Sequence, residues 1–411
     1  MGIASATRRT LSGAALVVVA AIAVAGCGSP QEAASSGGGD TTPYKVGLVY
    51  SQTGALASYG KQYIDGFKAG LSYATKGTNK VGSHPVELTE VDDAGDPAKA
   101  VSAAKDQIGK GVKILAGSTS SGVGLAVAPI AAQDKALFIS GAAATDGITG
   151  ANRYTFRSGR QSYQDVLTAK SFIDDATGKK VVVFAQDSAF GQANVAAVKA
   201  VIGGAGASVT EVLVPADAKE FTTFAKRALD AKGDLTFVAW AGTTAPAMWQ
   251  ALDQQGVLSS TTVVTGLDIR ASWPTFGAAG TKIKFLAHYF DGASANAAYA
   301  ALKKAVGTTD LFHPDGFAAA QMVVHALESI DVAGRGSSEA SGTDVDAMVK
   351  SLEGWSFESV KGTTTVRAAD HALLQPMFQA KLSGSGSDLK ADLVKALKPD
   401  EAAPPAGTFK G

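Results

Sequence analysis

The stretch ILAGSTSSGVGLA, residues 114–126, decides the fold prediction for the rest of the chain. Its first three residues are apolar and predict a short buried strand, and the apolar residues from Val123 onward predict a helix. A loop of glycine, serine and threonine joins the two. The first N–H groups of a helix lack intrahelical partners and lie at the positive end of its dipole, so this loop can hold a carboxylate. The alternative is that Ser120 or Ser121 only caps its own helix.

A second stretch of the same kind, LFISGAAATDGIT, covers residues 137–149. It is again a short apolar run that leads into small and polar residues. In open α/β sheets, ligands bind beyond the carboxyl ends of the strands, where neighbouring loops meet. The two stretches therefore predict one crevice lined by the loops that follow two adjacent strands.

Length and composition limit the classes of protein to consider. The chain has 411 residues with 46% hydrophobic content, which favours two lobes over one. Basic and acidic residues are equal at 37 each, so no basic field indicates nucleic-acid binding. The single cysteine, Cys27, excludes an internal disulfide and a cysteine-based metal site. We expect no cofactor and no metal.

The N-terminal residues predict export and a lipid anchor. Arginines at positions 8 and 9 precede an apolar run over 14–24, and Val-Ala-Gly-Cys at 24–27 resembles the bacterial lipobox. Residues 1–26 are then a signal peptide, and acylated Cys27 holds the protein on the outer face of the plasma membrane. An ordinary transmembrane anchor is the alternative. The arginine pair also resembles a twin-arginine signal, so the export route stays open.

From residue 44 onward, predicted strands alternate with predicted helices in two long runs. This spacing is typical of parallel sheets with right-handed crossovers, and it predicts an α/β fold of two doubly wound lobes joined by a three-segment hinge. The expected boundaries are 1–26 for the signal peptide, 27–43 for a flexible tether, 44–156 plus 290–357 for lobe 1, 157–289 plus 358–385 for lobe 2, and 386–411 for a C-terminal tail.

Catalytic and nucleotide-binding motifs are missing from the sequence. No G-x-S-x-G elbow occurs, and neither a G-x-G-x-x-G nor a phosphate-binding loop follows any predicted strand. The five histidines are scattered along the chain. We therefore expect no enzyme. A hydrolase remains the third hypothesis, and it would require turnover that depends on residues of the crevice.

Seven segments, taken in order, resemble the type I periplasmic binding proteins of the leucine/isoleucine/valine-binding group, the extracellular receptors of ABC importers. The segments are VGLVYSQTGALASYG (46–60), VDDAGDPAKAV (91–101), ILAGSTSSGVGLAVAPIA (114–131), FISGAAATDGIT (138–149), VVVFAQDSAFGQANV (181–195), ALDQQGV (251–257) and HPDGFAAAQMVVHAL (313–327). Their order and spacing carry the resemblance, which covers most of residues 44–382. It implies two hinged lobes that close on a ligand.

The resemblance implies specific ligand contacts. Ser121 matches the serine that binds the ligand's carboxylate, and Ala142 matches a backbone carbonyl that contacts its ammonium group. Tyr59 matches the aromatic residue of the first loop. Asp268 matches the acid of the second lobe that pairs with the ammonium, a charge-assisted bond that forms fully only on closure. The alternative for Tyr59 is to staple its own helix, and for Asp268 to orient the following turn.

Three positions depart from the family pattern. Ala144 stands where a threonine is expected, with Thr145 one residue later. Phe190 replaces a tyrosine, and Thr243 or its neighbour stands where an aromatic residue is common. These departures leave open which ligand is bound. We expect a small branched-chain-like amino acid or a related carboxylate.

The resulting prediction is a monomeric, lipid-anchored receptor without chemistry of its own. The ligand binds the open form, bridges the lobes and stabilises the closed form, which ABC permease subunits recognise. No nucleic-acid partner is expected. The alternative is a lipoprotein of the same fold that senses a ligand and signals without transport.

Overall fold

The computed structural model describes residues 41–331 and 342–410. The signal peptide and the acylated Cys27 that the sequence predicts lie outside these residues, as does all but the end of the tether. Within the described ranges, no helix combines the length and the apolar character that crossing a bilayer requires.

The first lobe is built on a six-stranded sheet with the order β2-β3-β1-β4-β5-β6. All neighbouring strands are parallel except β2, which pairs antiparallel with β3. The strands are β1 (Tyr44–Tyr50), β2 (Lys80–Val81), β3 (His84–Asp92), β4 (Ile114–Ala116), β5 (Leu137–Ser140) and β6 (Thr155–Arg157). The order reverses between β1 and β4, so a crevice opens at their carboxyl ends.

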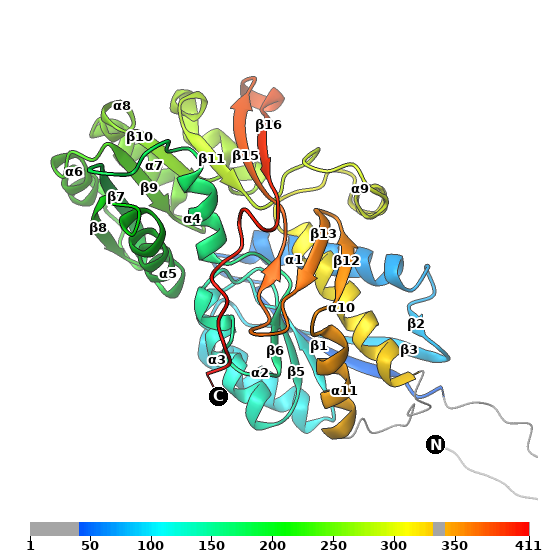
Figure 1. Cartoon of the computed structure of the whole chain (residues 1–411). Coiled ribbons are helices and arrows are strands. Elements are labelled where there is room, and N and C mark those ends of the chain that lie inside the picture. The colour runs from blue at the N-terminus through cyan, green and yellow to red at the C-terminus, as the bar shows by residue number, and fades with distance from the viewer. Residues whose placement is uncertain (1–40, 332–341, 411) are drawn as a thin grey trace, which may run out of the picture. The chain divides into compact units, whose positions relative to one another are not determined.

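Helices cover both faces of this sheet (Figure 1). The helices of this lobe are α1 (Ala57–Ala74), α2 (Pro97–Gly109), α3 (Ser121–Gln133), α9 (Ala297–Val306), α10 (His313–Asp331) and α11 (Gly342–Leu352). Helices α1 and α10 pack closely because glycines lie between them. A Cβ atom at Gly66 would lie 1.9 Å from the His313 carbonyl oxygen, and one at Gly316 would lie 1.9 Å from that of Tyr63. A side chain at either position would push the two helices apart.

The second lobe is built on a seven-stranded sheet with the order β16-β15-β11-β10-β9-β7-β8. Its strands are β7 (Lys180–Asp187), β8 (Ser208–Pro215), β9 (Leu235–Ala239), β10 (Thr262–Gly266), β11 (Lys284–Ala287), β15 (Met377–Ser383) and β16 (Lys390–Leu397). The first five are parallel, whereas β15 and β16 are antiparallel to their neighbours. The order reverses between β7 and β9, as it does in the first sheet. The predicted fold class, two doubly wound parallel-sheet lobes, is confirmed.

The helices of the second lobe follow the predicted alternation. They are α4 (Ser162–Lys170), α5 (Ala189–Val198), α6 (Thr222–Asp230), α7 (Ala245–Gln254) and the short α8 (Val257–Ser260). Strand β7 is apolar over five consecutive buried residues, as expected for a parallel strand covered on both faces.

The chain crosses from the first lobe to the second for the last time after residue 358, the predicted boundary. Strands β12 (Ser356–Ser359), β13 (Gly362–Val366) and β14 (Leu373–Leu374) form a small antiparallel sheet. Phe357, Val366 and Leu373 belong to the same buried cluster as the core of the first lobe. The chain therefore enters the second lobe only between β14 and β15, because these apolar side chains are buried against lobe 1.

The C-terminal segment, predicted as a tail over 386–411, contains a strand of the second sheet. Residues 390–397 form β16, the edge strand of the second sheet, of which only Leu397 is fully buried. Figure 1 shows the chain running on from β16 to the end marked C. There the Lys410 N–H donates to the Gly150 carbonyl at 2.9 Å, and Arg367 donates to the carbonyl of Pro404 at 2.8 Å. An edge strand with few buried residues lacks the apolar pattern that would have revealed it.

Candidate functional site

The carboxyl ends of both sheets face one cavity of about 410 Å³. From the first lobe it is lined by the residues that follow β1, β4 and β5. From the second lobe it is lined by those that follow β7, β9, β10 and β11. Seven of the nine residues that the sequence predicts for the ligand site line this cavity: Tyr59, Ser120, Ser121, Ala142, Ala144, Phe190 and Asp268. Thr145 and Thr243 are not part of the lining.

The loop between β4 and α3 forms the first wall of the cavity. Ser120 is the N-cap of α3, and its hydroxyl accepts a hydrogen bond from the Val123 N–H at 3.4 Å. The Ser121 hydroxyl accepts one from the Thr145 N–H at 3.2 Å. Both hydroxyls still have a proton to donate to a ligand. Gly117 is required at the loop start because it has φ +116° and a Cβ atom there would lie 1.9 Å from the Val49 carbonyl oxygen.

The loop after β5 presents backbone and small side chains to the cavity. The Ala142 carbonyl accepts a hydrogen bond from Arg160 Nη1 at 2.9 Å, and the Ala144 carbonyl accepts one from the Ser162 N–H at 2.7 Å. Thr145 is not among the lining residues, and it caps a short 3-10 helix (Asp146–Ile148), with its hydroxyl 3.3 Å from the Gly147 N–H. The structure therefore gives Thr145 a role in the loop itself, so it does not replace the side chain missing at Ala144.

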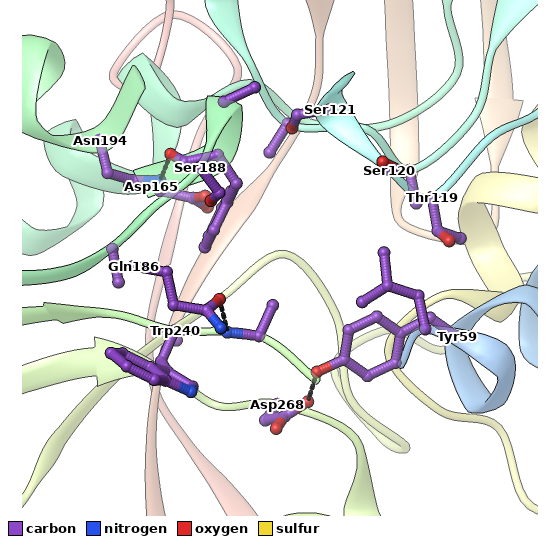
Figure 2. A pocket seen from close by; sticks show the side chains of 18 of the residues that line it. Tyr59, Thr119, Ser120, Ser121, Asp165, Gln186, Ser188, Asn194, Trp240 and Asp268 are labelled. Carbon is purple, nitrogen blue, oxygen red and sulfur yellow. Dashed lines mark hydrogen bonds between the residues drawn. The ribbon is translucent and has the colours of Figure 1, made fainter. Parts of the chain in front are cut away.

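Tyr59 and Asp268 bring the two lobes together at one edge of the cavity (Figure 2). The Tyr59 hydroxyl, on α1, donates to Asp268 Oδ1 at 2.8 Å and accepts from the Gly242 N–H at 3.2 Å. Asp268 follows β10 with φ +59°, a left-handed conformation that aspartate tolerates better than most residues. Burial is the main cause that raises the pKa of the Asp268 carboxyl. No cation of the described chain lowers that pKa, so its negative charge is stabilised by hydrogen bonds alone.

Aromatic side chains form the second wall. Phe190, at the start of α5, and Trp240, after β9, are both half-buried. The Trp240 ring stacks on Phe184 at 5.8 Å between ring centroids, and its Nε1 donates to the Thr244 hydroxyl at 3.1 Å. Phe312 reaches the cavity from the first lobe and packs against Tyr59. This part of the cavity fits an apolar group of a ligand.

Several lining residues were not predicted as site residues. They are Thr119, Arg160, Asp165, Gln186, Trp240, His288 and Phe312. Gln186 and His288 stand at or just after the ends of predicted strands, so the strand-end rule that selected Ser121 also applies to them. Nothing in the spacing around Arg160 or Phe312 indicates a place in the cavity, because their loops are brought there by the crossings between lobes.

The charged groups of the cavity differ in their protonation. Burial raises the pKa of Asp165 to about 6, against the opposing effect of the adjacent Arg160 guanidinium. Burial and the positive charges of Arg160 and Lys361 hold the pKa of His288 well below its usual range, so this imidazole is neutral. Within the described ranges, no cluster of three or more acidic, histidine or cysteine side chains is arranged to hold a metal ion.

Comparison with known proteins agrees with this geometry. A family model described as "Periplasmic binding protein" matches residues 43–388. A Leu/Ile/Val-binding protein of Rhizobium johnstonii is 28% identical over 196 residues, which cover 47% of this chain and 53% of that protein. The chain thus aligns with about half the length of this relative.

Two crystal structures from Rhodopseudomonas palustris are similar over nearly their whole length. An ABC-type branched-chain amino acid transporter protein is 30% identical with a TM-score of 0.72, covering 89% of this chain and 100% of that one. A solute-binding protein in complex with 4-hydroxybenzoate is 22% identical with a TM-score of 0.76, covering 87% and 97%. The second likeness concerns the fold alone. The chain belongs to the periplasmic binding protein family, as a type I solute-binding protein of the branched-chain amino acid group and not as an enzyme.

Proposed function

We propose that this protein is the extracytoplasmic receptor of an ABC importer and binds a small amino acid or a related carboxylate between its lobes. The observation that carries the proposal is the pairing of unlike walls around one cavity. Hydroxyls and a helix N-terminus lie on the first wall, and the Asp268 carboxyl lies across from them. A molecule with a carboxylate at one end and an ammonium at the other complements both.

Asp268 is the group that favours an ammonium. Its carboxyl has a raised pKa and hydrogen-bond donors as its neighbours. A ligand cation beside it would stabilise the charged form, and the gain would be greatest when the closed lobes exclude water. The Tyr59 hydroxyl and the Ile269 N–H both donate to Oδ1 and hold the carboxyl in place for the ligand.

The apolar part of the ligand would lie against Phe190, Trp240 and Phe312. These rings can pack against an aliphatic or an aromatic side chain, and the similar protein of 30% identity is described as a branched-chain amino acid transporter. Phe190 offers no hydroxyl to a polar side chain. We therefore favour a ligand that is apolar away from its carboxylate.

Binding would act through closure of the lobes. The Tyr59–Asp268 bond joins residues 209 positions apart, one on each lobe. A ligand that contacts both walls stabilises this closed arrangement by its differential affinity for it. The closed form would then be recognised by membrane permease subunits.

A thermal-shift screen of the purified protein tests the binding function. The panel contains amino acids, their amides, aliphatic and aromatic carboxylates, and neutral sugars. A ligand at about 100 times its dissociation constant stabilises the folded protein by roughly 2.7 kcal/mol, a visible rise in melting temperature. A response to amino acids or carboxylates supports the proposal, whereas a response to neutral sugars alone refutes it.

The lipid anchor is tested separately through Cys27. If Cys27 is acylated, the protein fractionates with membranes, and Cys27→Ser releases it while leaving the ligand response unchanged. Equal membrane association of the two proteins would contradict lipidation at this residue and favour an uncleaved anchor.

A further inference from the structure

Two arginines lie at the first crossing between the lobes and differ in how their guanidinium groups are used. Arg157 ends β6 and Arg160 follows three residues later, just before α4. Both are buried, with 1% and 8% of their surfaces exposed. Arg160 lines the cavity, whereas Arg157 does not. Their shared position makes them a natural comparison.

Arg157 has all its donors bonded to the protein. Nε donates to the Gly159 carbonyl, Nη1 to the Thr145 carbonyl and the Thr149 hydroxyl, and Nη2 to the carbonyls of Ala143 and Arg160. A guanidinium has five N–H groups, so none is left for a ligand. Arg157 therefore holds the crossing and the loop after β5 together.

Arg160 has bonds on one side of its guanidinium only. Nε donates to Asp165 Oδ2 at 3.2 Å and Nη1 to the Ala142 carbonyl at 2.9 Å. Nη2 makes no hydrogen bond to any residue of 41–331 or 342–410. Because Arg160 lines the cavity, this free donor is available to a ligand, and a carboxylate can accept a charge-assisted hydrogen bond from it.

The charge of Arg160 acts inside the cavity. It is among the groups that lower the pKa of His288, and it opposes the large rise in the pKa of the Tyr59 hydroxyl. Both residues line the cavity. In Figure 2, the Arg160 partner Asp165 lies near Ser188 and Asn194, apart from Tyr59 and Asp268. The cavity thus contains a positive group as well as the carboxyls of Asp165 and Asp268.

The same arginine changes the role of Ala142. The resemblance assigns the Ala142 carbonyl to the ligand's ammonium, but Arg160 Nη1 already donates to that oxygen. An ammonium at this carbonyl would lie beside a like charge, which disfavours it. A carboxylate at the same place would instead accept from the free guanidinium edge.

We propose that Arg160 is a specificity-determining residue that binds the carboxylate of the ligand through Nη2. This inference rests on the proposed function, since it assumes that the cavity holds a small carboxylate. An ammonium group, where the ligand has one, then lies toward Asp268. A ligand without an ammonium, such as an aromatic acid, keeps the Arg160 contact and makes none with Asp268.

Isothermal titration with matched acids and amides tests the proposal. The probes are L-leucine against L-leucinamide and benzoate against benzamide. The wild-type protein should bind at least one acid about 10- to 100-fold more tightly than its amide, as expected for a charge-assisted hydrogen bond. Arg160→Gln should reduce that ratio to near one. Arg160→Lys keeps the positive charge beside Asp165 but lacks the Nη2 donor, so it should reduce the acid-to-amide affinity ratio several-fold.

Arg157→Lys is the matched control, because it alters a buried arginine of the same crossing outside the cavity. It should lower the melting temperature and keep the acid-to-amide ratio. A ratio that survives in Arg160→Gln, or a wild-type protein that binds amides as tightly as acids, overturns the role of Arg160 while the receptor function stands. A wild-type protein that binds neither acids nor amides of the wider screen overturns the proposed function and this inference together.

Discussion

The two walls of the cavity are built in different ways. On the first wall, the hydroxyls of Ser120 and Ser121 accept hydrogen bonds from backbone N–H groups only 3 and 24 residues away. On the second wall, the Asp268 carboxyl accepts from the neighbouring Ile269 N–H at 2.7 Å and also from Tyr59, 209 residues earlier in the chain. The first wall is thus held by its own lobe, whereas the second-wall acid is held by a partner on each lobe.

This difference affects energetics as well as position. The first wall offers neutral donors that are already anchored, so a ligand gains hydrogen bonds there at little cost in ordering. The second wall offers carboxyls whose charged forms are disfavoured by burial, and the pKa values of Asp268 and Asp165 are both raised. Substitutions on the second wall should therefore have larger and more ligand-dependent effects than those on the first.

The largest effect is expected for Asp268→Ala. With an amino-acid ligand, the substitution leaves the ammonium without a partner and should weaken binding by about 2–5 kcal/mol in calorimetry. Asp253→Ala, at an exposed acid of α7, is the matched control and should leave affinity unchanged. Equal affinity of the Asp268→Ala and wild-type proteins for amino acids would remove this carboxyl from the ligand site.

Tyr59→Phe tests the link between the walls. The substitution removes the donor to Asp268 and the acceptor for the Gly242 N–H, while the ring keeps its packing against Phe312. A hydrogen bond to a charged group contributes about 1.5–3 kcal/mol, so ligand affinity should fall by about that amount. The double substitution Tyr59→Phe with Asp268→Ala should lower the binding free energy by less than the sum of the two single losses. Additive losses would show that the two residues act independently.

The sequence predicts the first wall better than the second for the same reason. The strand at 114–116, the strand at 137–140 and the start of α3 depend on local apolar runs and a capping serine, and all lie where the pattern places them. Ser121, which the sequence places at the start of this helix, lines the cavity. Arg160 and Phe312 reach the cavity through crossings between lobes, and no local pattern encodes that approach.

At the C-terminal end of the fold, too, local sequence patterns do not predict every element. The alternation of buried parallel strands predicts both sheets, because such strands are continuous apolar runs. Strand β16 was not predicted because it lies at an edge of the sheet and is mostly exposed, so its residues do not form a continuous apolar run. The position at which the chain enters the second lobe was not predicted either, since only tertiary packing places Val366 and Leu373 in the core of the first lobe.

A pH dependence of stability should arise from the second wall. The Asp165 carboxyl has a pKa of about 6 in the folded protein, above its ordinary value, so folding takes up protons between these values. As pH rises from about 4 to about 6, this group's contribution should lower the free energy of unfolding by on the order of 2 kcal/mol. Urea unfolding of the ligand-free protein across this range measures it. Asp165→Asn should flatten the dependence, and an unchanged slope would locate its origin elsewhere.

The smallest effects are expected on the first wall, where Ser121→Ala and Ser120→Ala form a matched pair. Ser121→Ala leaves the Thr145 N–H without its acceptor and removes one donor to the ligand. The loss of ligand affinity should be only about 1–2 kcal/mol, because the backbone donors of α3 remain. Ser120→Ala removes the cap of α3 and should lower the free energy of unfolding by about 1 kcal/mol, and it should lower affinity less than Ser121→Ala does. Affinity comes from calorimetry and stability from urea unfolding. A loss of affinity in Ser121→Ala as large as that in Asp268→Ala would mean that the serine hydroxyl contributes more than the helix start to the first wall's hold on the carboxylate. It would also erase the energetic difference between the two walls.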